Sequence, residues 1–198
     1  MRSGRVPVLS DFQLRWLVAC ALCMPSMVWA HTGGEGSGGS FLYGVTHPFS
    51  GGDHLLAMLA VGLWAAQNGG RWLWSLPAVF VTLMLAGATA ALAGWGLPYA
   101  EQAVVASLFL FGLMVAGACP AGAVFGVLLV GAFAVFHGFA HGAEIPATSD
   151  AFSYALGFLL STAFLHGAGI GFAALLRHWL TRLVGAGIAL SGVFFVLN

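Results

Sequence analysis

The stretch AGAVFGVLLVGAFAVFHGFAHGAE, residues 121–144, decides the fold of this chain. It is apolar along its length, and its ionisable side chains, His137, His141 and Glu144, stand near its end. Its length fits the ~17–25 residues of a helix that spans a lipid bilayer. It lacks the period-two alternation of a membrane β-barrel strand. We therefore expect a transmembrane helix here.

The whole chain has the same character. Of its 198 residues, 60% are hydrophobic and 6% are charged, whereas a soluble domain carries roughly 25% charged residues. There is no Lys and the formal net charge is zero, so no basic patch for nucleic acid exists. No Gly-rich phosphate-binding loop ending in Gly-Lys-Ser or Gly-Lys-Thr occurs, which argues against ATP hydrolysis. We expect the lipid bilayer to be a partner of this chain, and we expect no nucleic-acid partner.

The first thirty residues (1–30) have the pattern of a secretory signal peptide. Arg2, Arg5 and Arg15 precede an apolar run, residues 16–29, that is shorter than the ~20 residues of a spanning helix. We predict cleavage after Ala30; an uncleaved first helix is the alternative.

Residues 31–42 are predicted to be a flexible polar N-terminal segment, because Gly33–Gly39 has the composition of a linker. Cleavage would leave His31 at the new N-terminus, where the α-amine and the imidazole together form a candidate metal chelate. A polar tail that binds nothing is the alternative.

The remainder, residues 43–198, divides into six apolar segments separated by short stretches with charges or helix breakers. We predict an all-α, polytopic membrane protein with six transmembrane helices. A homo-oligomer is compatible with the sequence. The expected segments are 43–67, 72–93, 102–118, 121–144, 151–176 and 179–197.

The charges agree with one orientation. A cleaved signal peptide places the mature N-terminus in the periplasm of a bacterial inner membrane. Arg71, Arg177 and Arg182 then fall at the cytoplasmic ends of the helices, as the positive-inside rule requires. Glu101 and Asp150 fall on the other side.

A first cluster of candidate ligands stands in the first segment. His47, Asp53 and His54 flank Pro48-Phe49-Ser50-Gly51-Gly52, a sequence that disfavours a continuous helix. We expect a break here, followed by a helix that starts near Asp53; Asp53 as a simple N-cap is the alternative. Met58, one turn after His54, is a further candidate ligand or a packing residue.

The second cluster is a helical stripe. His137, His141 and Glu144 have the spacing i, i+4, i+7, and His pairs at i, i+4 can bind one metal ion. Gly138 and Gly142 form a parallel stripe that lets another helix approach closely. In the predicted topology both clusters lie at the periplasmic face of the inner membrane. His166 lies deeper, on the fifth helix, either on an ion path or bonded to a backbone carbonyl.

Histidine with carboxylate and without cysteine suits Ni²⁺, Co²⁺, Zn²⁺ or Fe²⁺ and disfavours Cu⁺. Ionisable groups inside a membrane usually mark a path for an ion or a proton. A permease for a divalent metal ion is therefore favoured over an enzyme. A metal- or haem-dependent membrane redox enzyme and an accessory membrane subunit are the alternatives.

Two motifs resemble the signature of the HupE/UreJ family: His47-Pro48-Phe49-Ser50-Gly51-Gly52-Asp53-His54 and Phe136-His137-Gly138-Phe139-Ala140-His141-Gly142-Ala143-Glu144. The resemblance extends over nearly the whole mature chain. It implies a nickel or cobalt permease of the bacterial cytoplasmic membrane, without a prosthetic group, in which Ni²⁺ or Co²⁺ is the cargo. The family's motifs map onto His47, Asp53, His54, His137, His141 and Glu144.

Overall fold

The computed structural model describes residues 37–197, and these form helices and connections without any strand. The all-helical prediction is therefore confirmed for this part of the chain. The signal peptide, its cleavage site and His31 lie outside the described residues. The elements are α2 (Ser37–Thr46), η1 (His47–Phe49), α3 (Gly52–Asn68), α4 (Trp72–Leu92), α5 (Ala100–Gly117), η2 (Gly122–Gly126), α6 (Val127–Ala143), α7 (Ala151–Leu175) and α8 (His178–Leu197).

Five of the described helices are long and apolar enough to cross a membrane, and a bent pair raises the number to six if it forms one span. The pair is Gly39–Phe49 with Gly52–Asn68, and its two parts meet at 77°. Large apolar side chains such as Trp74, Leu128 and Phe164 are exposed along the helices, as expected for surfaces solvated by lipid. The length and apolar character of its helices thus indicate a membrane protein.

The break between α2 and α3 follows from the local sequence, as predicted. Pro48 sits in the first turn of the 3-10 helix η1, and Gly51 is extended, with φ −101° and ψ 117°. The helix α3 begins at Gly52, so Gly51 is its N-cap residue and Asp53 lies in its first turn. An acidic residue there is stabilised by the helix dipole. The alternative of Asp53 as the N-cap is wrong, because Asp53 lies two residues after Gly51.

The helix α2 begins at Ser37, within the segment predicted to be a flexible polar linker up to residue 42. Tertiary packing explains the difference. At Gly44 and Gly157, a Cβ would overlap backbone atoms of Tyr154 and Phe41, so α2 and α7 lie in direct backbone contact. Such contact favours helix formation despite the low helix propensity of glycine.

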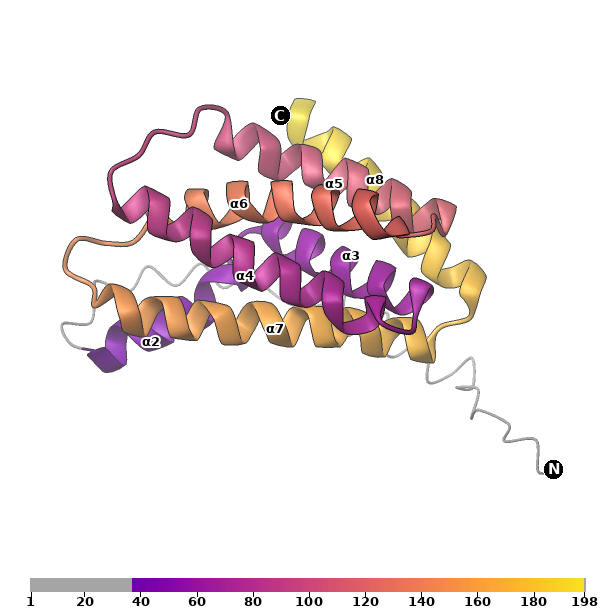
Figure 1. The fold of residues 1–198 in the computed structure, drawn as a ribbon, viewed down its shortest axis with the longest axis horizontal. Coiled ribbons are helices and arrows are strands. Elements are labelled where there is room, and N and C mark those ends of the chain that lie inside the picture. Colours follow the sequence, from indigo (N-terminus) through magenta and orange to yellow (C-terminus); the bar gives the residue numbers. More distant parts are fainter. Residues whose placement is uncertain (1–36, 198) are drawn as a thin grey trace. The chain divides into compact units, whose positions relative to one another are not determined.

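Glycines make the other close helix pairs in the same way. The helix α4 packs along α6, α5 along α8, and α3 along α7 (Figure 1). A Cβ at Gly138 would overlap Met84 O, and one at Gly142 would lie 2.7 Å from Ala88 O. The predicted close approach along the Gly138–Gly142 stripe is confirmed, with α4 as the partner. His137 and His141 lie about 100° round α6 from this stripe, and both rings contact His54 of α3.

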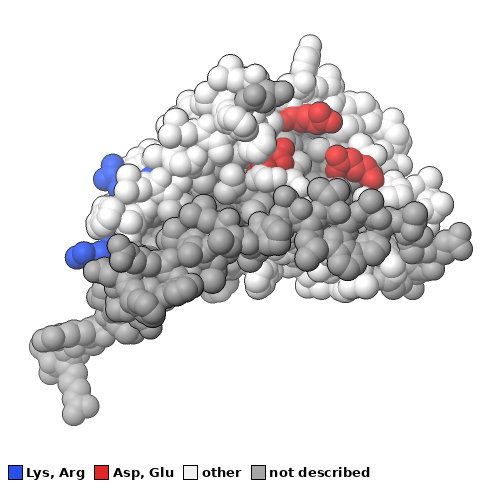
Figure 2. Space-filling model, turned by 180° about the vertical axis from the view of Figure 1, so that it is seen from behind, with Lys and Arg blue, Asp and Glu red and all other residues white. Residues whose placement is uncertain are grey.

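Charged side chains lie at opposite ends of the described helices. Arg71 precedes α4, Arg177 precedes α8, and Arg182 donates to Ala116 O at the end of α5. Glu101 and Asp150 lie at the other end, where α5 and α7 begin. Figure 2 shows the basic and acidic groups apart on the face it displays. The helices therefore have one basic and one acidic end, as the predicted topology requires.

Candidate metal centre

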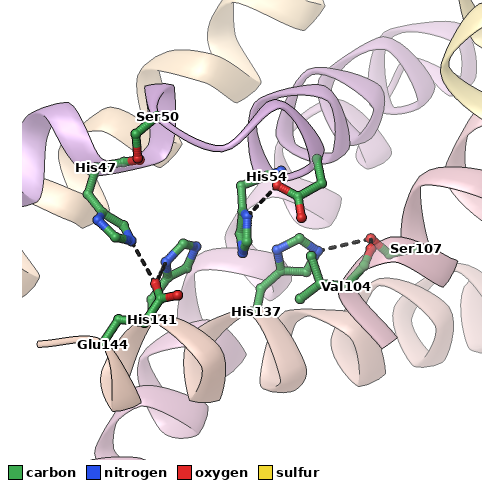
Figure 3. Close-up of polar contacts among 9 residues, drawn as sticks. His47, Ser50, His54, Val104, Ser107, His137, His141 and Glu144 are labelled. Atoms are coloured by element: carbon green, nitrogen blue, oxygen red, sulfur yellow. Dashed lines mark hydrogen bonds and ion pairs between the residues drawn. The ribbon is translucent and has the colours of Figure 1, made fainter. Parts of the chain in front are cut away.

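The two sequence clusters meet in space. The motif between α2 and α3 lies against the last turns of α6, so that histidines far apart in the chain become neighbours (Figure 3). The ring centroids of His54 and His141 are 4.1 Å apart, and those of His47 and His141 are 4.9 Å apart. Two groups result in which each residue has a ligand atom within 4.8 Å of the others. They are His54, His137 and His141, called the inner triad, and His47, His141 and Glu144, called the outer triad.

His141 belongs to both triads. Its side chain is 4% exposed, and neither ring nitrogen has a hydrogen-bond partner in the part of the chain that the structure describes. Its Nδ1 atom lies 3.6 Å from Glu144 Oε2. His141 is thus a buried imidazole that lies between the other ligands of both triads, with Glu144 near one ring nitrogen. A metal ion is the chemical species that suits it.

In the outer triad, His47 Nε2 lies 2.9 Å from Glu144 Oε2. Glu144 ends α6, just beyond the apolar helix, and its side chain is 51% exposed. The neighbouring imidazoles of His141 and His47 hold the pKa of the Glu144 carboxyl well below its ordinary value. The carboxylate is therefore negatively charged at neutral pH, and attracts cations at the acidic end of the helices.

In the inner triad, His54 is oriented by Asp53. The Asp53 carboxylate accepts hydrogen bonds from the His54 backbone N–H and from His54 Nδ1, each at 2.8 Å. A carboxylate on Nδ1 keeps the proton there and leaves the lone pair on Nε2, which is buried and has no hydrogen-bond partner among residues 37–197. Asp53 itself is in neither triad. It reaches the site through His54, and its role as a direct ligand stays a prediction.

His137 is oriented by a residue that sequence reasoning missed. The Ser107 hydroxyl donates to Val104 O at 2.6 Å, so its oxygen accepts from His137 Nε2–H at 2.9 Å. The proton on Nε2 leaves the lone pair on Nδ1, which has no partner among the described residues. Both Ser107 and His137 are fully buried. The signal was a serine alone inside an apolar helix, which points to a buried hydrogen-bond partner.

Aromatic rings enclose the triads. Phe158 lies 4.2 Å from His141 between ring centroids, and Tyr154 lies 5.8 Å from His47. Both come from α7, whose first turn is capped by Asp150, with Phe152 N and Ser153 N as donors. A small cavity of about 20 Å³ beside His141 lies between α4, α6 and α7. These rings were also missed, since aromatic residues in an apolar helix carry no distinctive signal.

Two further candidates stand apart from the triads. Met58 is fully buried in the hydrophobic core, one turn beyond His54 on α3. Its sulfur as a ligand stays a prediction. His166 is buried on α7, and belongs to neither triad. No carbonyl among the described residues accepts from its ring, so the alternative of a carbonyl-bonded core histidine finds no support.

Comparison with known proteins agrees with the motif resemblance. The model of the family "HupE / UreJ protein" matches residues 18–195. The chain is similar to a protein from Rhizobium leguminosarum bv. viciae named "Protein HupE", with 40% identity over 182 residues, which cover 90% of this chain and 94% of that protein. No solved structure matches.

Proposed function

Because this chain belongs to the HupE/UreJ family, we propose that it is a secondary permease that carries Ni²⁺ or Co²⁺ from the periplasm to the cytoplasm of a bacterium. The family is generally linked to nickel and cobalt uptake. In this proposal the acidic end of the helices faces the periplasm and the basic end faces the cytoplasm. The chain is then a carrier and not an enzyme, and the ion is cargo.

One observation carries the proposal: the ligand groups form a gradient of exposure from the surface into the helix core. The side chain of Glu144 is 51% exposed, those of His54 and His47 are 14% and 13% exposed, that of His141 is 4% exposed, and His137 is fully buried. A structural metal site has no need of such a gradient. A site that takes up an ion from water and passes it inward does.

The chemistry of the two triads supports the same direction of movement. The outer triad combines a carboxylate with two imidazoles, a set that accepts a partly hydrated cation. The inner triad consists of imidazoles alone, which suit Ni²⁺ and Co²⁺ better than Mg²⁺ or Ca²⁺. An ion that moves inward exchanges Glu144 and His47 for His54 and His137 while His141 stays bound. Because His141 stays bound throughout, the ion never loses all of its protein ligands in a region with little water.

The test is uptake of Ni²⁺, Co²⁺, Zn²⁺ and Mg²⁺ into proteoliposomes by the wild type and by His54→Ala, His137→Ala and His141→Ala. We expect Ni²⁺ or Co²⁺ to be taken up by the wild type. The largest loss is expected for His141→Ala, because this residue belongs to both triads. The matched control is Cys119→Ser, which removes a thiol that lies in neither triad. Equal uptake by all variants would contradict the assignment.

The two alternative functions give different results. A haem or iron chromophore in the purified protein would favour a membrane redox enzyme. A protein that binds Ni²⁺ but gives no uptake when expressed alone in a cell lacking nickel transport would favour an accessory subunit. A colourless protein that restores uptake on its own supports the permease.

A further inference from the structure

His166 is a buried ionisable group that belongs to neither triad. It is 1% exposed, in the interior of α7, and both ring nitrogens lack a hydrogen-bond partner in the described part of the chain. A buried imidazole that serves packing alone normally has at least one partner. Ionisable residues inside a membrane protein usually belong to an ion or substrate path. The two free nitrogens therefore indicate a group that interacts with something that comes and goes.

One aromatic ring connects His166 to the inner triad. The Phe80 centroid is 5.4 Å from that of His137 and 5.0 Å from that of His166. Phe80 is fully buried on α4, so it contacts a histidine of the triad and the lone histidine at once. The Phe80 ring therefore lies beside both histidines.

The position of His166 along α7 places it deeper than either triad. Phe158 contacts both His47 and His141, which sets the level of the outer triad on α7. His166 follows two turns later, about 12 Å farther along the helix axis at the usual rise per residue. Gly62 fixes it there, because a Cβ at Gly62 would overlap His166 O, so α3 and α7 touch at this level.

A cavity lies beyond His166 at the basic end of the helices. Its volume is about 360 Å³, and Ile170, one turn after His166, is in its wall. Gln67 contributes a buried Oε1 atom without a hydrogen-bond partner among the described residues. The cavity walls come from α3, α7, α8 and the connection before α8.

We propose that His166 is a separate transfer ligand for the divalent transition-metal ion, between the inner triad and this cavity, with the Phe80 ring as the barrier between the triad and His166. The proposal rests on the proposed function. The ion leaves the inner triad, passes Phe80, is held by a ring nitrogen of His166, and reaches the cavity, where the Gln67 oxygen and water replace the imidazole. His166 then sets the rate of passage and contributes nothing to the binding of the ion at the triads.

The experiment compares Ni²⁺ binding and Ni²⁺ transport in the same variants. Equilibrium binding is measured on the purified protein by titration with Ni²⁺ alone, and transport as initial uptake into proteoliposomes. We expect His166→Ala to bind Ni²⁺ with the affinity of the wild type and to transport it at least about tenfold more slowly, a loss no smaller than that for removal of an outer hydrogen-bond partner of a metal ligand. His166→Phe keeps a ring and removes the ligand, so it separates loss of the ligand from creation of a cavity and carries the test if the alanine variant does not fold. His137→Ala serves as the reference that loses binding.

The outcomes separate this inference from the function on which it rests. Transport at the wild-type rate by His166→Phe overturns the role of His166 and leaves the metal permease intact. Loss of Ni²⁺ binding in the folded His166→Phe variant also overturns the inference, because His166 would then be part of the triad site. Unchanged Ni²⁺ binding in His137→Ala overturns the proposed site itself.

Discussion

His47 Nε2 lies 2.9 Å from Glu144 Oε2, although the two residues are 97 positions apart in the chain. This contact joins the break between α2 and α3 to the end of α6. It also places the most exposed ligand of the outer triad beside the 3-10 turn that Pro48 starts. The break in the first helix therefore places His47 beside the end of α6, the helix that carries His141.

Glu144→Gln is expected to weaken capture of the ion more than its passage. The variant keeps an oxygen near His47 but removes the charge that attracts a cation to the acidic end. We expect a higher KM for Ni²⁺ uptake with a smaller change in the maximal rate, measured as initial rates in proteoliposomes over a range of Ni²⁺ concentrations. Glu101→Gln removes a charge at the same end, outside both triads, and is the control. An equal rise in KM for both variants would attribute the effect to the surface charge and not to the triad.

Ser107→Ala is expected to lower the affinity for Ni²⁺ by about 10–100-fold, although Ser107 is no ligand. Without the hydroxyl, His137 Nε2–H loses its acceptor, and the ring is no longer held in the tautomer that offers Nδ1. The measurement is titration of the purified protein with Ni²⁺, together with ¹⁵N chemical shifts of labelled histidine, which report the tautomer. Ser191→Ala is the control, because the Ser191 hydroxyl makes the same kind of bond, to Ile188 O, and has no hydrogen bond to a histidine in the described part of the chain. An unchanged tautomer population would contradict the orienting role.

Asp53 variants distinguish an orienting group from a direct ligand. Asn retains an oxygen that accepts from His54 Nδ1–H, whereas Ala does not. We therefore expect Ni²⁺ affinity to fall in the order wild type, Asp53→Asn, Asp53→Ala, with the alanine variant about 10–100-fold below the wild type. Asp150→Asn, at the same end but outside both triads, is expected to bind as the wild type does. Equal losses for Asp53→Asn and Asp53→Ala would favour a carboxylate that binds the ion directly.

Gly138→Ala is expected to destabilise the protein by about 1–3 kcal/mol, the usual cost of overpacking. The added Cβ overlaps Met84 O and forces α4 and α6 apart. The measurement is thermal unfolding in detergent, followed by circular dichroism. Gly171→Ala, in α7, meets no atom within 4 Å and is expected to be neutral or stabilising, because alanine favours a helix over glycine by about 1 kcal/mol. Equal destabilisation by both variants would argue that helix contact at Gly138 is not the cause.

Much of the fold was predictable because lipid leaves few solutions for an apolar chain. The five later segments agree with α4, α5, α6, α7 and α8 to within a few residues at most ends. The first segment was predicted to break between His47 and His54, and it does, because Pro48 and the glycines oppose a helix there. The helical start at Ser37 was not predictable, since it depends on the contact between α2 and α7.

The sequence by itself determined that His47, Asp53, His54, His137, His141 and Glu144 are the candidate ligands, because ionisable groups are costly in an apolar chain. It also placed both clusters at one membrane level. Only the tertiary structure divided them into two triads that share His141 and placed Phe80 in contact with both His137 and His166. It also showed that Asp53 and Ser107 are the hydrogen-bond partners of His54 Nδ1 and His137 Nε2. These relationships depend on how closely helices approach, and that distance is set by glycine contacts between segments far apart in the chain.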